Sequence, residues 1–222
     1  MVVVVRIFVQ TAKNSGRRAE VFIIGLTGGI ASGKSTVSKI LAEQGAIILD
    51  ADAVARTLSM PNEAGWKLFV EHFGSAVLLE NQCLDRAKIG QLVFADDKER
   101  EWVNNMMHPQ IKEELLRRLA RLQAENAKVV VLDIPLFFET KWDAFVNTVW
   151  VVYVNEKIQV ERLMKRNNLS EKLARQRIAS QISLKEKVKQ ADFVINNTEN
   201  IESTRQQVVA AWEKIWKEKI EQ

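Results

Sequence analysis

Short hydrophobic runs recur along the chain and predict the strands of a sheet. Five runs have the length and β-branched content of strands, at residues 21–26, 46–49, 129–132, 148–154 and 192–195. The run 129–132 has no polar position, which is typical of a strand buried on both faces. After the first run, hydrophobic residues at 37, 40 and 41 lie on one helical face. Strands that alternate with helices predict an α/β fold with a five-stranded parallel sheet.

Two segments between these strands are too long and too helical to be simple crossovers. Residues 54–126 read mostly as helix, with interruptions expected at Gly65, Gly74, Gly90 and the His108-Pro109 step. We expect an inserted helical subdomain that covers a substrate next to a nucleotide. Residues 157–189 form a second helical segment, predicted to be a lid. The core would then comprise residues 21–53, 127–156 and 190–222.

Within the predicted insertion, one hydrophobic stripe runs along the last helix, at residues 111, 115, 119 and 122. The basic residues off this stripe, Lys112, Arg117, Arg118 and Arg121, are expected to form a solvated face. His108 is more typical of a helix boundary than of a catalyst.

The first 20 residues are predicted to be an N-terminal extension of a domain that begins near Val21. Residues 1–9 are hydrophobic, but Arg6 interrupts them, so they are too short to span a bilayer and make a poor secretory signal. The extension could be a flexible arm, an added edge strand or the product of an upstream start codon. No other hydrophobic run is long enough to span a membrane, and no membrane partner is expected.

Composition narrows the class of protein. A chain of 222 residues, 47% of them hydrophobic, can bury one sizeable core. Its 32 basic and 28 acidic residues are too balanced to indicate nucleic acid, and the aromatic residues are not interleaved with basic ones as in a nucleic-acid module. The single cysteine, Cys83, cannot form an intramolecular disulfide or a cysteine metal cluster, which favours a reducing, cytoplasmic setting.

The strongest motif is the segment Gly28 to Ser35, which matches G-x-x-x-x-G-K-[ST] at every fixed position. It lies between a predicted strand and a predicted helix, where backbone N–H groups and the helix dipole converge on phosphate. Lys34 would reach the β- and γ-phosphates, and Ser35 would bind Mg²⁺. The predicted nucleotide-binding residues of this segment are Gly28, Gly29, Ile30, Ala31, Ser32, Gly33, Lys34, Ser35 and Thr36.

Carboxylates follow the second and third strands. Asp50 and Asp52 come at the end of residues 46–49, and alternation along the strand would aim both at the phosphate loop. A helix cap would explain one of these carboxylates but not both. Asp133 ends the third strand in the place of a Walker-B carboxylate and is predicted to reach Mg²⁺ through water. Glu139 could be a second site residue or a salt-bridge partner.

The basic excess of the chain is concentrated in the predicted lid. Residues 157–189 contain ten Lys or Arg against three Glu. Arg162 and Arg166, one helical turn apart, are predicted to close over a triphosphate and to supply charge for phosphoryl transfer. For the distal lysines, Lys185, Lys187 and Lys189, a solvated helix face is the favoured interpretation.

Four motifs in order resemble the dephospho-coenzyme A kinase family: G-L-T-G-G-I from Gly25, D-A-D from Asp50, H-P at 108–109 and D-I-P-L-F-F-E from Asp133. The resemblance extends from about Val21 to Trp216. It implies a core of five parallel strands, a helical coenzyme-A-binding domain and a lid. It also implies that ATP, with Mg²⁺, phosphorylates the ribose 3′-hydroxyl of dephospho-coenzyme A in the last step of coenzyme A synthesis.

The resemblance assigns residues as well. The family's proposed base falls on Asp52 and its lid arginine on Arg166. The family's I-x-N-x-G segment implies that Asn197 is an adenine neighbour, but Glu199 stands where the family has glycine. Ala31 likewise replaces a usual glycine of the phosphate loop. Glycine adopts positive φ at low cost and glutamate does not, so Glu199 puts the local backbone turn in question. Ala31 is small and should still let phosphate approach.

These observations together predict in-line transfer of a phosphoryl group. Asp52, Lys34, Arg162 and Arg166 are the predicted catalytic residues, with Ser35 and Asp133 at the metal. The alternative is another small-molecule or nucleoside monophosphate kinase with the same loop. A GTPase would need N-K-x-D and D-x-x-G motifs, which the sequence lacks. We expect a small-molecule substrate and a monomer or a weak homo-oligomer.

Overall fold

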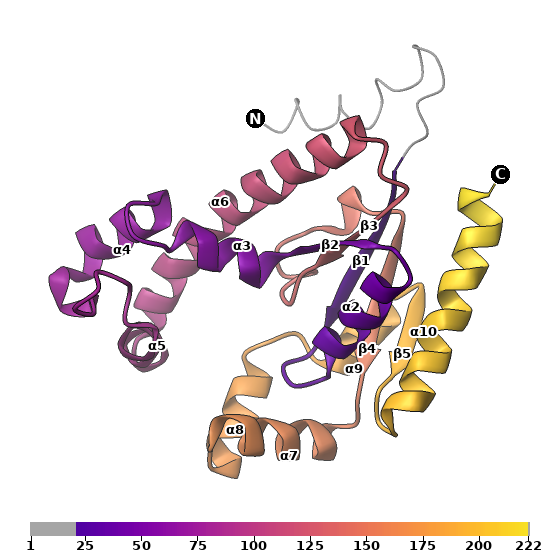
Figure 1. The fold of residues 1–222 in the computed structure, drawn as a ribbon. Helices are drawn as coiled ribbons and strands as arrows, with labels where there is room; N and C mark the ends of the chain where they lie inside the picture. The colour runs from indigo at the N-terminus through magenta and orange to yellow at the C-terminus, as the bar shows by residue number, and fades with distance from the viewer. Residues whose placement is uncertain (1–20, 222) are drawn as a thin grey trace.

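The computed structural model describes residues 21–221, and the predicted N-terminal extension, residues 1–20, lies outside them. Its centre is one parallel sheet with the strand order β2-β3-β1-β4-β5 (Figure 1). The strands are β1 (Phe22–Gly28), β2 (Ile47–Asp50), β3 (Val129–Asp133), β4 (Thr148–Tyr153) and β5 (Phe193–Asn196). The predicted five-stranded parallel sheet is confirmed. This order places β1, and the loop that follows it, in the middle of the sheet.

Helices cover both faces of the sheet. On one face, α2 (Lys34–Glu43) and α10 (Ile201–Ile215) pack against Ile24 and Leu26 of β1. On the other face, Ile23 packs with residues of α3 (Ala51–Leu58), α6 (Asp97–Ala124) and α9 (Leu184–Lys189). Adjacent strand residues point to opposite faces, so both faces need hydrophobic side chains, and each buried one contributes about 1.5–3 kcal/mol. The continuous hydrophobic runs in the sequence have this cause.

The segment between α3 and α6 forms a small helical unit beside the sheet (Figure 1). It contains α4 (Ala64–Phe73), the short helix η2 (Ser75–Val77) and α5 (Arg86–Ala95). Its own hydrophobic cluster is made of Phe69, Val77, Leu84, Ile89 and Met107. Helix α6 joins this cluster to the core, because its later residues Leu115 and Leu119 pack under the sheet.

Three of the four helix interruptions predicted in this segment are wrong. Gly65 lies inside α4, Gly90 inside α5 and Pro109 inside α6, and of the four only Gly74 ends a helix, with φ 75°. Gly65 is used for close packing, since a Cβ there would lie 2.7 Å from the Leu58 carbonyl oxygen. Pro109 removes one helical N–H donor, but packing on both sides keeps α6 continuous. Tertiary contacts therefore override the breaker residues.

The basic segment is made of three helices. It contains α7 (Glu156–Asn167), α8 (Glu171–Ala179) and α9, and the side chains of Asn155, Ser170 and Ser183 cap their first turns. Val160, Leu163 and Ala174 form a cluster in it, and Ile30 and Ala31 of the phosphate loop pack against this cluster. The segment therefore touches the phosphate loop directly.

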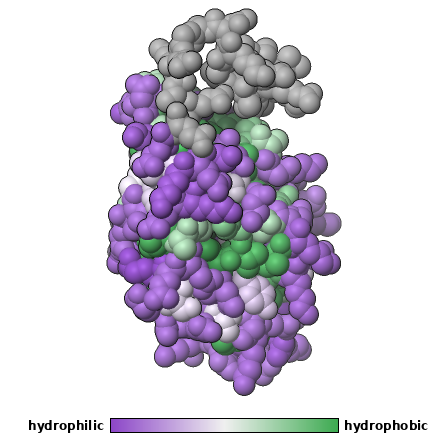
Figure 2. Space-filling view, turned by 90° about the vertical axis from the view of Figure 1, so that its right-hand side faces the viewer, coloured by the Kyte–Doolittle hydropathy of each residue, from purple (hydrophilic) through white to green (hydrophobic). Residues whose placement is uncertain are grey.

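The chain ends with α10 and a short π-helix, η4 (Trp216–Ile220). Figure 2 shows the side of the molecule on which α10 lies, with mostly hydrophilic side chains around a smaller hydrophobic area. Trp212 and Trp216 stack with their ring centroids 5.6 Å apart, so these two rings pack against each other. Among residues 21–221, no helix combines the length and the hydrophobicity needed to cross a bilayer.

Candidate active site

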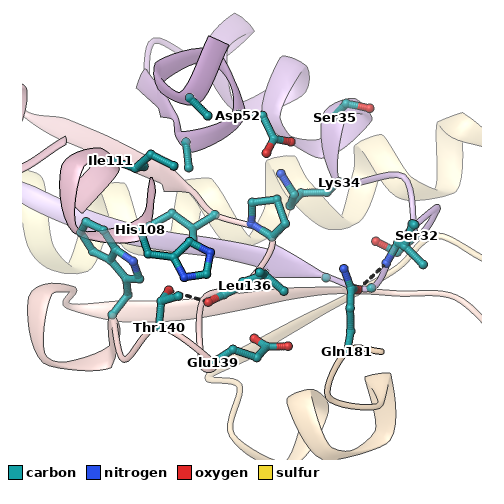
Figure 3. A pocket seen from close by; sticks show the side chains of 18 of the residues that line it. Ser32, Lys34, Ser35, Asp52, His108, Ile111, Leu136, Glu139, Thr140 and Gln181 are labelled. Atoms are coloured by element: carbon teal, nitrogen blue, oxygen red, sulfur yellow. Dashed lines mark hydrogen bonds between the residues drawn. The ribbon is translucent and has the colours of Figure 1, made fainter. Parts of the chain in front are cut away.

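One large cavity, of about 1220 Å³, opens where the strands β1 and β3 end. Its wall brings together the phosphate loop, the start of α3, one face of α6, the loop after β3 and part of α7 (Figure 3). Ligands bind at the carboxyl ends of strands in open parallel sheets, so this is the expected place for a site. Of the predicted site residues, the wall includes residues 28–35, Asp52, Arg162 and Arg166, whereas Thr36, Asp133 and Asn197 lie outside it.

The phosphate loop is held from below by Asn197. The Asn197 side chain donates to the Ser32 carbonyl at 2.8 Å and accepts from the Thr204 hydroxyl at 2.8 Å. Gly33, with φ 90°, lies directly against this amide, and a Cβ at Gly33 would collide with it. Only glycine fits there. The Asn197 amide is thus engaged with the protein on both its nitrogen and its oxygen. The predicted contact of Asn197 with adenine stays a prediction.

Lys34 and Asp133 form an ion pair at the base of the cavity. Burial raises the pKa of the Asp133 carboxyl, and the Lys34 ammonium and the Ser38 hydroxyl oppose this rise. The next residue, Ser35, is exposed at the start of α2. The geometry therefore pairs the Lys34 ammonium with the carboxylate at the end of β3, and it places the Ser35 hydroxyl next to Lys34 at the start of α2.

The two aspartates after β2 have different roles. Strand β2 ends at Asp50, and Asp52 lies in the first turn of α3, so the predicted strand-like alternation of the two side chains is wrong. Asp50 caps the helix by accepting from Asp52 N at 2.8 Å and Ala53 N at 3.1 Å. The Asp52 carboxylate lies on the wall of the cavity and faces Lys34 (Figure 3). The cap thus explains one carboxylate and leaves the other for chemistry.

Two arginines of α7 complete the basic side of the cavity. Arg162 donates to the Asn197 carbonyl at 3.1 Å, which ties it to the residue that holds the phosphate loop. Arg166 donates to the side chain of its neighbour Asn167, at 2.9 Å, and to no other group within residues 21–221. Lys165 lies between them on the wall. With Lys34, these groups make one end of the cavity strongly positive.

The other end of the cavity is less polar and was mostly missed from the sequence. Its wall includes His108, Ile111, Lys112, Thr140 and Trp142. Burial lowers the pKa of His108, which favours the neutral form of its ring. Figure 3 shows this ring turned into the cavity between Ile111 and Leu136. The sequence shows the hydrophobic stripe of α6, but it does not show that Ile111 and Leu115 of this stripe line a cavity.

Lys112 is not part of a solvated face, which corrects the prediction for this residue. Its ammonium lies 4.4 Å from the ring centre of Phe145 and 5.1 Å from that of Trp142. Burial lowers its pKa, and Asp143 opposes this change. The two aromatic partners come from a loop about 30 residues away, so no local pattern reveals them.

Lys187 is also not solvated: it is completely buried. Its ammonium lies 3.0 Å from Glu139 Oε1 and donates to the Pro135 carbonyl at 3.0 Å. Burial lowers the pKa of Lys187, while the Glu139 carboxylate opposes this change. The structure thus shows Glu139 as a salt-bridge partner, and the same residue also lies on the cavity wall, so the other interpretation, a second site residue, stays a prediction.

The two positions where glycine was expected behave differently. Ala31 has φ 61°, in the left-handed region, so the loop keeps the backbone of glycine without its freedom. Glu199 is not among the residues of 21–221 with positive φ. Glu199 is therefore not placed in the left-handed region that favours glycine.

Comparison with known proteins gives a consistent result. A family model described as dephospho-CoA kinase matches residues 22–203. A dephospho-CoA kinase of Oryza sativa subsp. japonica is 44% identical over 203 residues, covering 89% of this chain and 88% of its own. One from Carboxydothermus hydrogenoformans is 46% identical over 195 residues, covering 88% and 94%. A solved structure of dephospho-CoA kinase from Campylobacter jejuni, 32% identical, superposes with a TM-score of 0.66 over 88% of this chain and 97% of its own.

Proposed function

The chain belongs to the dephospho-CoA kinase family, and we propose that it transfers the γ-phosphoryl group of ATP to the ribose 3′-hydroxyl of dephospho-CoA, giving CoA and ADP. One observation carries the proposal beyond family membership. The Asp52 carboxylate lies on the cavity wall, on the same cavity as the phosphate loop and the less polar end. An acceptor bound at that end would present its hydroxyl between this carboxylate and a γ-phosphate. The alternative, another small-molecule or nucleoside monophosphate kinase, is not favoured, because the relatives reported above are dephospho-CoA kinases.

The phosphate loop and Lys34 would bind the β- and γ-phosphates. The Lys34 ammonium is paired with Asp133. A triphosphate offers this ammonium a second anionic partner, and transfer of phosphoryl charge is stabilised by such fixed cations. Arg162 and Arg166 would approach the same phosphates from α7, and the free guanidinium nitrogens of Arg166 make it the stronger candidate for the transferring group.

The residues present also suit Mg²⁺. An exposed serine hydroxyl, Ser35, and a carboxylate, Asp133, are oxygen donors of the kind that Mg²⁺ binds together with phosphate oxygens and water. Within residues 21–221 no three acidic, histidine or cysteine side chains cluster as a ready-made metal site. When bound, the ion would neutralise charge between the β- and γ-phosphates. Asp133 would hold it through water.

Asp52 would orient the acceptor hydroxyl and take up its proton. Its position in the first turn of α3 is fixed by the Asp50 cap, which bonds the backbone N–H of Asp52 itself. A base of this kind contributes about 10²- to 10⁴-fold to the rate. The insertion and the lid would exclude water by closing over both substrates, which prevents transfer to water.

We propose in addition that the enzyme acts in the cytoplasm as a monomer or a weak homo-oligomer. The single cysteine suits a reducing compartment. Light scattering over a range of concentrations would measure the oligomeric state.

The test of function is a panel of acceptors. ADP release would be followed with MgATP and, in turn, dephospho-CoA, AMP, shikimate or no acceptor. We expect rapid release only with dephospho-CoA, and a product that carries its new phosphate on the ribose 3′-oxygen by ³¹P NMR. ADP release with AMP but not with dephospho-CoA would show that the acceptor is a nucleoside monophosphate. ADP release without any acceptor would show that the protein is an ATPase.

A further inference from the structure

Both backbone groups of Ile30, in the middle of the phosphate loop, are bound by glutamine side chains from the basic segment. Gln181, which follows α8, accepts the Ile30 N–H through Oε1 at 3.0 Å. Gln159, on α7, donates through Nε2 to the Ile30 carbonyl at 2.8 Å. Gln159 is buried, whereas Gln181 lies on the cavity wall. The two contacts are chemically opposite, one an acceptor and one a donor.

The contact with Ile30 decides which way the Gln181 amide points. A backbone N–H can only bond the oxygen of a carboxamide, because its nitrogen is a donor too. The NH₂ group is therefore directed away from Ile30, and Figure 3 shows it on the side of Lys34, within the cavity. No acceptor among residues 21–221 takes a hydrogen bond from this nitrogen. An oriented donor with no protein partner among residues 21–221 thus lies on the wall of the cavity that the phosphate loop also lines.

The base of Gln181 is fixed as well. The next residue, Ile182, donates its N–H to Glu139 Oε1 at 3.1 Å, and Glu139 is held by the buried Lys187. On the other side, a Cβ at Gly29 would lie 2.9 Å from Leu184 Cγ, so the loop and this segment are in close contact. Gln181 thus has little freedom to turn its amide, and a donor that needs no reorientation is favourable for catalysis.

We propose that Gln181 is a further catalytic residue, whose NH₂ group donates a hydrogen bond to the transferring phosphoryl group. The inference rests on the proposed function, because it requires a γ-phosphate above Lys34. The Ile30 N–H orients the carboxamide, and Gln159 keeps the Ile30 peptide in place without touching substrate. The donor adds to the charges of Lys34 and Arg166 without adding a charge of its own. A hydrogen bond to a charged oxygen that strengthens in the transition state corresponds to about 10- to 100-fold in rate.

The experiment compares four variants in single-turnover phosphoryl transfer, with ATP affinity and Tm measured in parallel. Gln181→Met removes both contacts of the amide at nearly constant volume. Gln181→Glu keeps the oxygen that accepts from Ile30 but loses the donor. Gln159→Met removes only the contact with the Ile30 carbonyl. Gln176→Met, at an exposed glutamine of α8, is the matched control.

We expect Gln181→Met to lose about 10- to 100-fold in the transfer rate, with ATP affinity and Tm close to the unchanged protein. Gln181→Glu should lose at least as much in rate and should also bind ATP more weakly, because its carboxylate repels the phosphates. Gln159→Met should lose far less, and Gln176→Met nothing. A wild-type rate for Gln181→Met would overturn the proposal. Equal losses for Gln181→Met and Gln159→Met would also overturn it, since both residues would then act only on the loop. Failure of the proposed function can be distinguished from failure of this inference, because in that case the unchanged protein itself would not phosphorylate dephospho-CoA.

Discussion

Lys187 Nζ lies 3.0 Å from Glu139 Oε1, but the two partners differ in exposure: the lysine side chain is fully buried, and 21% of the glutamate side chain is accessible. The consequences of removing either partner should differ accordingly. The buried ammonium would keep only the Pro135 carbonyl, whereas the carboxylate could be hydrated from the cavity. Removal of the carboxylate should therefore cost more free energy of unfolding than removal of the ammonium, although the two charges are equal in size.

Glu139→Gln should lower the free energy of unfolding by about 3–5 kcal/mol, because it leaves an uncompensated buried charge. Lys187→Met should cost clearly less, and the double variant should recover part of the loss of Glu139→Gln. Urea denaturation measures each value. Glu186→Gln, which removes an exposed pair with Lys189, is the control and should change little. A larger loss for Lys187→Met than for Glu139→Gln would contradict the asymmetry.

Ala31→Gly should stabilise the protein and tighten ATP binding. A left-handed alanine costs about 1–2 kcal/mol, and the greater freedom of unfolded glycine offsets about 0.4–1 kcal/mol of this gain. Thermal unfolding and nucleotide titration should show the net effect, about 0.5–1 kcal/mol. Ala120→Gly, at an exposed position inside α6, should instead destabilise by about 1 kcal/mol. The same sign for both variants would show that the backbone at Ala31 is not strained.

Asp52→Asn should preserve ATP binding and reduce turnover by about two orders of magnitude or more, the scale for loss of a general base. Asp50→Asn is a matched control, because asparagine also accepts from the N–H groups of residues 52 and 53 and keeps the cap. We expect it to turn over at nearly the original rate. If Asp52→Asn weakens ATP binding while turnover survives, the carboxylate is structural.

Acid should remove the stabilisation that Glu114 contributes. Hydrogen bonds from Arg117 and Arg118 hold the pKa of Glu114 at about 2, below its ordinary 4.5. A lowered carboxyl pKa stabilises the fold above the ordinary value, and this contribution is lost as the pH falls from about 4.5 to 2. The Tm difference between the unchanged protein and Glu114→Gln should therefore shrink over this range. A difference independent of pH would exclude the ion pairs as its cause.

Much of this architecture could be predicted because its causes are local. The β-branched run of β3 and the motif from Gly28 to Ser35 each depend on neighbouring residues, and both were placed correctly. Lys187 and Lys112 were misjudged because Glu139 and Phe145 lie 48 and 33 positions away along the chain. A sequence shows that a lysine is charged but does not show what it packs against. The NH₂ group of Gln181 is a similar case, since its direction depends on the Ile30 backbone.

Pro109 gives α6 a mechanical property. The missing N–H leaves the carbonyl of Asn105 without its helical donor, so this turn is held by one bond fewer than its neighbours. It also lies between Met107, which belongs to the cluster of the small helical unit, and Leu115, which belongs to the core. A bend here would move that unit relative to the sheet, and Leu58 and Ile111, which pack against both clusters, would have to shift with it. The turn of α6 that has one hydrogen bond fewer is therefore the turn that carries His108, on the wall of the cavity that the acceptor would enter.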